Sequence, residues 1–130
     1  MRWRNKEMDY EYYMYGLIMI KDYLIEILNG TKTFDARSYP TNKRGVIALI
    51  DSRTMKIYGT IELVDCRKIS AEEYCSWHTT GRFQNYVFEV PNKNAIFYAY
   101  DFEKPRKLIK PIKVNVEKHT WVELPKDIVV

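Results

Sequence analysis

Five consecutive apolar residues, Val46–Ile50, constrain the fold of this chain more than any other feature. The run does not alternate between apolar and polar residues, which is typical of a strand covered on both faces. The turn residues Asp51–Thr54 follow, and Lys56–Asp65 then alternates as a half-buried strand does. The sequence therefore predicts a hairpin whose first strand lies in the middle of a sheet.

Two helices are predicted around this hairpin. Residues 21–28 carry an apolar stripe, and Asn29-Gly30 provides a stop, because glycine accepts the left-handed conformation that follows a helix. A capping box at Ser70–Glu73 predicts a short helix that runs to about Trp77 and ends before Gly81. Further strands are predicted at residues 16–20, 33–37, 86–90, 95–102, 112–116 and 121–124, with a loop framed by Pro105 and Pro111.

Six or seven short strands with one or two helices predict an α+β, mainly β fold. We expect a small β-barrel or curled sheet with one or two capping helices, without parallel βαβ repetition. A length of 130 residues with 46% hydrophobic content fits one domain. We expect residues 15–130 to form it and residues 1–14 to be an N-terminal extension. In that tyrosine-rich start, a packed or disordered terminus is favoured over a protein-interaction segment.

The net charge of +4 permits an anionic partner such as nucleic acid but does not require one. The basic residues are scattered, with clusters at Lys43-Arg44 and from Lys104 to Lys110, and a solvated basic surface explains them about as well. We expect no membrane association, because the longest apolar run, Gly16–Ile20, is too short to span a bilayer. A cytoplasmic location and a monomer are favoured.

The two cysteines, Cys66 and Cys75, fit neither a zinc site nor a disulfide framework, and buried free thiols are expected. We predict no metal and no cofactor.

The charged segment Gly30–Arg37 is the predicted functional site. In strand geometry, Phe34 and Ala36 lie on one face, which we expect to anchor the core, while Thr33, Asp35 and Arg37 share the other. Lysine offers a mobile point charge, and arginine a planar fork that suits phosphate or a base edge. The alternative is a surface salt-bridge network at the junction of helix and strand, which stabilises the fold by about 0–1 kcal/mol.

With Gly30, Lys32, Asp35 and Arg37 in register, the segment resembles the G-x-K-x-x-E-x-R signature of the ASCH domain, a branch of the PUA-like superfamily. An aspartate stands where that signature has glutamate. Residues 57–60, 98–100 and 108–112 are also similar to later parts of the family's domain, and Trp121 lies where such domains often carry a closing aromatic. The resemblance extends over roughly residues 17–124 and implies a PUA-like barrel.

In that family the motif borders a cleft proposed to bind RNA, and a few small members are hydrolases of modified nucleosides or RNA. The resemblance thus implies an RNA- or modified-nucleotide-binding domain. The candidate ligand-binding residues are Gly30, Lys32, Asp35, Arg37, Tyr39, Arg44 and Tyr100. Trp77, Tyr100 and Trp121 are aromatics on which a base could stack, although packing in the core is the favoured role for each.

The alternative function is a small hydrolase, amidohydrolase-like or ribonuclease-like. In it Lys32 would be the catalytic residue and Thr33 the nearest hydroxyl. The family's amidohydrolase branch carries its catalytic threonine where Asp35 stands. For its catalytic glutamate, Glu62 and Glu73 are conceivable substitutes, but ordinary surface carboxylates are the favoured interpretation of both.

Overall fold

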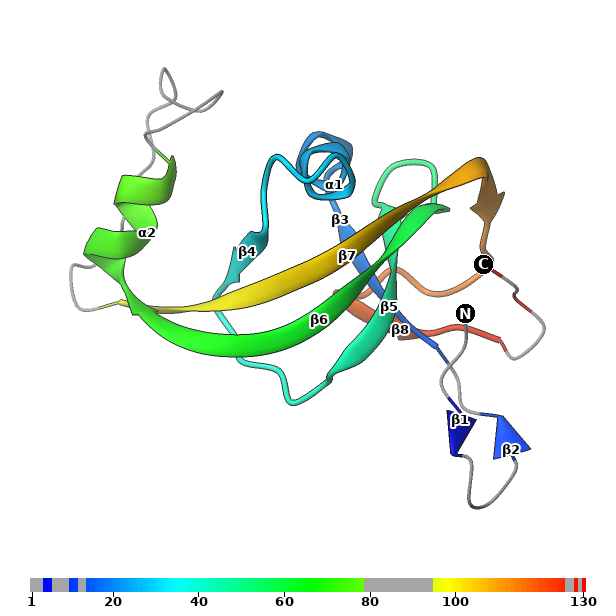
Figure 1. Cartoon of the computed structure of the whole chain (residues 1–130), viewed down its shortest axis with the longest axis horizontal. Helices are drawn as coiled ribbons and strands as arrows, with labels where there is room; N and C mark the ends of the chain where they lie inside the picture. Colours follow the sequence, from blue (N-terminus) through cyan, green and yellow to red (C-terminus); the bar gives the residue numbers. More distant parts are fainter. Residues whose placement is uncertain (1–3, 6–9, 12–13, 79–94, 126–127, 129) are drawn as a thin grey trace. The chain divides into compact units, whose positions relative to one another are not determined.

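The computed structural model describes residues 4–5, 10–11, 14–78, 95–125, 128 and 130. Strands predominate, and two helices accompany them (Figure 1), so the predicted α+β, mainly β class is confirmed. The elements are β1 (Arg4–Asn5), β2 (Tyr10–Glu11), β3 (Tyr15–Met19), α1 (Lys21–Leu28), β4 (Phe34–Arg37), β5 (Gly45–Asp51), β6 (Lys56–Ser70), α2 (Ala71–His78), β7 (Ile96–Lys113) and β8 (Trp121–Glu123).

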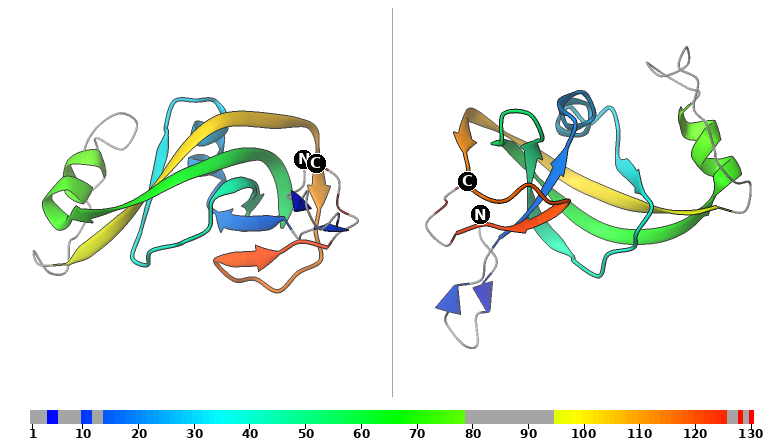
Figure 2. Two further views of the ribbon diagram at one scale, coloured as in Figure 1. Left: turned by 60° about the horizontal axis from the view of Figure 1, so that its bottom comes forward. Right: turned by 180° about the vertical axis from the view of Figure 1, so that it is seen from behind.

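Six strands follow one another in the order β4-β7-β6-β5-β3-β8, and β1 pairs with β2 in a separate ribbon. The sheet is mixed, because β3 is parallel to β5, whereas the β5–β6, β3–β8 and β4–β7 pairs are antiparallel. The order is open within the described residues, with β4 and β8 at its two ends, so closure into a barrel is not confirmed. The long neighbours β6 and β7 can be followed in both views of Figure 2.

The chain divides into two compact units, and strands β6 and β7 each contribute residues to both. Unit 1 consists of Met1–Thr33, Lys43–Val64 and Phe102–Val130, and unit 2 of Phe34–Asn42 and Asp65–Asp101. No helix in the described part of the chain is both long and apolar enough to cross a membrane.

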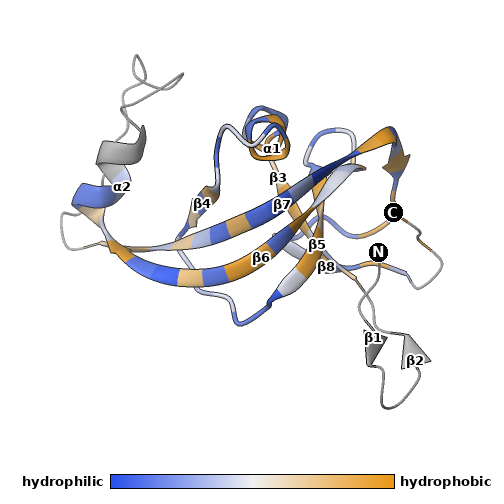
Figure 3. Cartoon of the chain, in the orientation of Figure 1, coloured by the Kyte–Doolittle hydropathy of each residue, from blue (hydrophilic) through white to orange (hydrophobic). Residues whose placement is uncertain are grey.

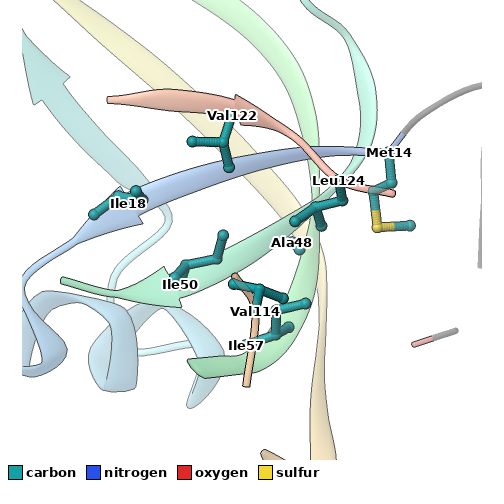
Figure 4. Close-up of a cluster of buried hydrophobic side chains, with 8 residues drawn as sticks. All are labelled: Met14, Ile18, Ala48, Ile50, Ile57, Val114, Val122 and Leu124. Atoms are coloured by element: carbon teal, nitrogen blue, oxygen red, sulfur yellow. The ribbon is translucent and has the colours of Figure 1, made fainter. Parts of the chain in front are cut away.

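The core of unit 1 confirms the predicted central strand. β5 lies between β3 and β6, and its residues Ile47–Asp51 are all buried. A cluster of buried apolar side chains packs around it (Figure 4): Met14, Ile18, Ala48, Ile50, Ile57, Val114, Val122 and Leu124. Burial of this kind is worth about 25 cal/mol per Å² of apolar surface removed from water.

A buried aspartate fixes the turn between β5 and β6. Asp51, 1% exposed, accepts hydrogen bonds from the Thr54 hydroxyl at 2.7 Å and from the N–H groups of Arg53 and Thr54, both at 3.3 Å. Burial raises the pKa of Asp51, but these hydrogen bonds and the charge of Lys21 outweigh it, and the pKa is lowered. The predicted hairpin is thus confirmed, with its turn held by a side chain.

The predicted loop between Pro105 and Pro111 is wrong, because β7 continues through both prolines to Lys113. The separate strand expected at residues 112–116 is wrong for the same reason. Among the described residues, β4 pairs only with residues 98–101 of β7, so beyond residue 101 the neighbour that β7 has in this part of the structure is β6. Proline has no N–H group to donate to a partner strand, so it is tolerated at a sheet edge, where that N–H group would face solvent. The strand expected at residues 86–90 lies outside the described residues.

Candidate nucleic-acid site in the charged motif

Gly30 ends α1 as the sequence predicts. Its φ of +78° is the left-handed conformation, and its N–H donates to the Ile27 carbonyl at 3.1 Å. The next two N–H groups, of Thr31 and Lys32, both donate to the carbonyl of Glu26. The chain is therefore tied to the helix end up to the lysine of the motif.

Lys32 lies against an aromatic ring of the preceding helix. Its ammonium Nζ is 4.9 Å from the centroid of the Tyr23 ring, a cation–π contact that the sequence analysis missed. Thr33 is exposed, and its carbonyl accepts a hydrogen bond from the Phe102 N–H at 2.8 Å. Gly30, Lys32 and Thr33 all belong to unit 1.

Asp35 and Arg37 form the best-defined pair of the motif, in unit 2. Arg37 Nε donates to Asp35 Oδ2 at 2.6 Å, and Asp35 is 6% exposed. The faces of β4 are thus covered differently from the prediction, because Asp35 is its buried residue, whereas Phe34 and Ala36 are half-buried. Asp35 stands opposite Tyr100 and Ala36 opposite Ala99 in the register with β7.

Tyr39 and Tyr100 are joined by a hydrogen bond and have opposite exposures. Tyr100 is 2% exposed, and its hydroxyl donates to the Tyr39 carbonyl at 2.7 Å. The Tyr39 side chain is 77% exposed. The Tyr100 ring therefore lies in the core, as the favoured interpretation predicted, and presents no face on which a base could stack.

A second charged pair in unit 2 was not predicted. Arg67 in β6 donates from Nε and Nη2 to the two carboxylate oxygens of Asp101 in β7, at 2.5 and 3.0 Å. These hydrogen bonds raise the pKa of Arg67. Nearby in the sequence, the rings of Tyr74 and Phe97 stack at 4.1 Å between centroids. The partners lie too far apart along the chain for local patterns to pair them.

The remaining predicted residues are distributed elsewhere. In unit 1, Arg44 is exposed and donates to the Lys43 carbonyl at 2.7 Å. The half-buried Trp121 contacts Tyr15 edge to face, and Lys43 Nζ lies about 5 Å from both rings, at 4.8 and 5.1 Å. Cys66 is a half-buried free thiol, not a buried one. The side chains of Trp77 and Cys75 lie outside the described residues.

Within the described residues, no cluster of three or more histidine, cysteine or carboxylate side chains is arranged to hold a metal ion. The arrangement in unit 2 offers instead an arginine held by a buried carboxylate and, two residues on, an exposed aromatic ring. Such a set suits the planar and anionic parts of a nucleotide.

Fold and motif together define a small α+β domain with a charged strand after its first helix. Among solved structures, the chain is similar to the ASCH protein of Zymomonas mobilis, with a TM-score of 0.65 and 14% identity, covering 88% of this chain and 89% of that one. Two single-residue variants of that protein also match, each with a TM-score of 0.64 and 15% identity. They cover 87% of this chain and 91% and 89% of their own.

This chain therefore has the fold of an ASCH domain. No protein-family model matches its sequence. No curated protein matches it either.

Proposed function

We propose that this chain is an ASCH-like, PUA-like module that binds RNA or a modified nucleotide through its charged motif. The observation that carries the proposal is the combination in unit 2 of Arg37, fixed by buried Asp35, with the exposed ring of Tyr39. Arg37 is suited to a phosphate or a base edge, and Tyr39 to the face of a base.

Burial favours this role over a surface salt-bridge network. An exposed ion pair is worth about 0–1 kcal/mol and needs no particular geometry. Here the Asp35 side chain is only 8% exposed and that of Arg37 22%, and the contact of 2.6 Å is charge-assisted. A buried carboxylate that fixes the plane of a guanidinium preorganises it, which lowers the entropic cost of binding a planar ligand.

Tyr39 supplies the stacking surface that the charges alone lack. The Tyr39 ring is open to a ligand, and the Tyr39 backbone is anchored by the Tyr100 hydroxyl. Base stacking on such a ring is worth about 1–3 kcal/mol. Tyr100, predicted as a ligand-binding residue, becomes a positioning residue in this proposal.

The other predicted residues belong to unit 1 and join the proposal on the strength of the sequence motif. Lys32 and Arg44 remain predicted ligand-binding cations of unit 1, and Gly30 sets the start of the motif segment.

Hydrolysis by Lys32 is the alternative, and one contact weighs against it. The ring of Tyr23 attracts the charged ammonium of Lys32, whereas a catalytic base must be the neutral amine. Binding is therefore our first proposal and catalysis the second. A screen of acylated nucleosides and short RNAs tests the second, which requires turnover that disappears in Lys32→Ala.

The test of binding is a fluorescence titration of labelled single-stranded RNA at several salt concentrations. Tyr39→Ala is the sharpest variant, because the exposed ring can be removed without disturbing the core. We expect affinity to fall about 5- to 100-fold in Tyr39→Ala and to be kept in Tyr39→Phe. Lys68→Ala, which removes an exposed charge of unit 2 outside the motif, is the control. Equal affinity of Tyr39→Ala and the native chain contradicts the proposal.

A further inference from the structure

A pocket of about 380 Å³ lies wholly within unit 1, away from the motif. It is lined by Val46, Thr60, Ile61, Glu62, Lys104, Pro105 and Arg106. Its size is at the lower end of the range for small-ligand pockets, and its lining combines apolar side chains with a few polar groups, as ligand sites do.

Thr60 is the first indication that the pocket takes a ligand. The residue is 3% exposed, and among the residues that the structure describes no side-chain hydrogen bond involves its hydroxyl. Most buried polar groups have a partner, and an unsatisfied one costs about 1–3 kcal/mol. A ligand that donates to or accepts from this hydroxyl would satisfy it.

Glu62 adds a hydrogen-bond acceptor to the same pocket. Its carboxylate is 3.4 Å from the Lys104 ammonium, whose side chain is 79% exposed. This ion pair is long and solvated, so it contributes little to stability and a ligand can replace it. A carboxylate accepts two parallel N–H donors at once, which matches the N1–H and N2–H₂ edge of guanine.

Positive charge continues from the pocket along β7. Residues 103–113 of this strand carry five exposed cations, with Glu103 as the one acidic residue: Lys104, Arg106, Lys107, Lys110 and Lys113. In Figure 3, hydrophilic and hydrophobic residues are interspersed along β7. In the described part of the chain, Arg106, Lys107 and Lys110 have no ion-pair partner. Of these three, Arg106 lines the pocket and presents there an unneutralised cation suited to a phosphate.

The backbone at the pocket rim is also unusual. Lys104 has a φ of +53°, which is strained for a residue with a side chain, and it directly precedes Pro105. Strain of this kind persists only where the surroundings fix it, and it is frequent at ligand sites.

We propose that this pocket binds a free guanine nucleotide. The base would enter the pocket, with its Watson–Crick edge on Glu62 and a hydrogen bond to the Thr60 hydroxyl, and Arg106 would bind the phosphate. The site uses none of the motif residues and goes beyond the function proposed above. A merely solvated basic surface explains the lysines of β7 but not the buried, unpartnered hydroxyl beside a carboxylate.

Calorimetric titration of the full chain with GMP, AMP and guanosine tests this site. We expect GMP to bind more tightly than AMP, and GMP affinity to fall as salt rises. Thr60→Val is the key variant, because it keeps the shape and removes only the hydroxyl. It should bind GMP about two- to tenfold more weakly while unfolding at the same or a higher urea concentration.

Two charge variants assign the parts of the ligand. Arg106→Gln should weaken GMP about tenfold or more and leave guanosine unchanged, whereas Glu62→Gln should abolish the preference for GMP over AMP. Lys56→Gln, which removes an exposed charge elsewhere in unit 1, should change neither. Absence of GMP binding, or equal binding by Thr60→Val and the native chain, overturns the proposal.

Discussion

Arg37 Nε donates to Asp35 Oδ2 at 2.6 Å across one intervening residue of β4, and the aspartate is the buried member of the pair. Removing the arginine leaves a buried carboxylate without this partner, whereas removing both side chains does not. We therefore expect Arg37→Ala to lower the free energy of unfolding by about 1–3 kcal/mol. The double variant Asp35→Ala/Arg37→Ala should lose less than the two single variants added together. A double-mutant cycle from urea unfolding measures this coupling, and strict additivity would falsify it.

Tyr100 and Tyr39 lead to a second prediction. Tyr100→Phe removes the hydroxyl that donates to the Tyr39 carbonyl but keeps the buried ring. The free energy of unfolding should fall by about 0.5–1.5 kcal/mol. If Tyr39 stacks on a base, RNA affinity should fall as well, because the exposed ring loses its anchor. Tyr98→Phe, on the same strand, is the matched control, and an equal effect of both variants contradicts the positioning role.

Local patterns in the sequence predicted those parts of the fold that depend on neighbouring residues. Asn29-Gly30 ends α1 through short-range hydrogen bonds, Ser70 accepts a hydrogen bond from the Glu73 N–H at the start of α2, and the hairpin of β5 and β6 follows its turn. Each of these features is determined by contacts within a few residues, so local sequence patterns predict it correctly.

The features that the sequence patterns did not predict depend on contacts between residues far apart in the chain. The alternating pattern predicts which residues of β4 share a face of the sheet but not which face is buried. Burial of β4 depends on its partner strand β7, where Tyr100 stands opposite Asp35. The pair of Arg67 and Asp101 joins residues 34 positions apart, and only the register of two long strands brings them together. The pocket at Thr60 likewise arises because the Lys104–Arg106 segment comes to line the same space.

Gly59 gives a third prediction, about close packing within unit 1. A Cβ atom there would lie 2.4 Å from the Arg106 carbonyl oxygen and 2.7 Å from Leu28 Cδ2. The carbonyl belongs to the backbone and cannot rotate away, so Gly59→Ala should cost about 1–3 kcal/mol of stability by overpacking.

Gly30 is the matched control for Gly59, because a Cβ there meets nothing within 4 Å and only its φ of +78° resists substitution. Asparagine tolerates that conformation better than alanine, so Gly30→Asn should be milder than Gly30→Ala, each measured by thermal unfolding. At position 59, both Gly59→Ala and Gly59→Asn should strongly lower the temperature of unfolding. A harmless Gly59→Ala would show that β7 does not approach β6 as closely as described.

Asp51 gives the last prediction, which concerns pH. Its pKa in the folded chain is lowered from 3.8, so the folded state favours the ionised carboxylate. The stability that this carboxylate provides is therefore complete above pH 3.8 and is lost as the pH falls through the lower folded-state pKa.

Asp51→Asn should unfold at a lower urea concentration than the native chain at pH 7, because the amide weakens the hydrogen bonds from Thr54 and Arg53. The difference in unfolding midpoint between the two proteins should shrink as the pH is lowered below 3.8, since the native side chain then becomes neutral as well.

Asp22→Asn, at an exposed position in the first turn of α1, is the control and should show a smaller difference from the native chain at pH 7. A gap between the native chain and Asp51→Asn that stays constant from pH 7 to pH 2 would mean that the charge of Asp51 does not stabilise the turn.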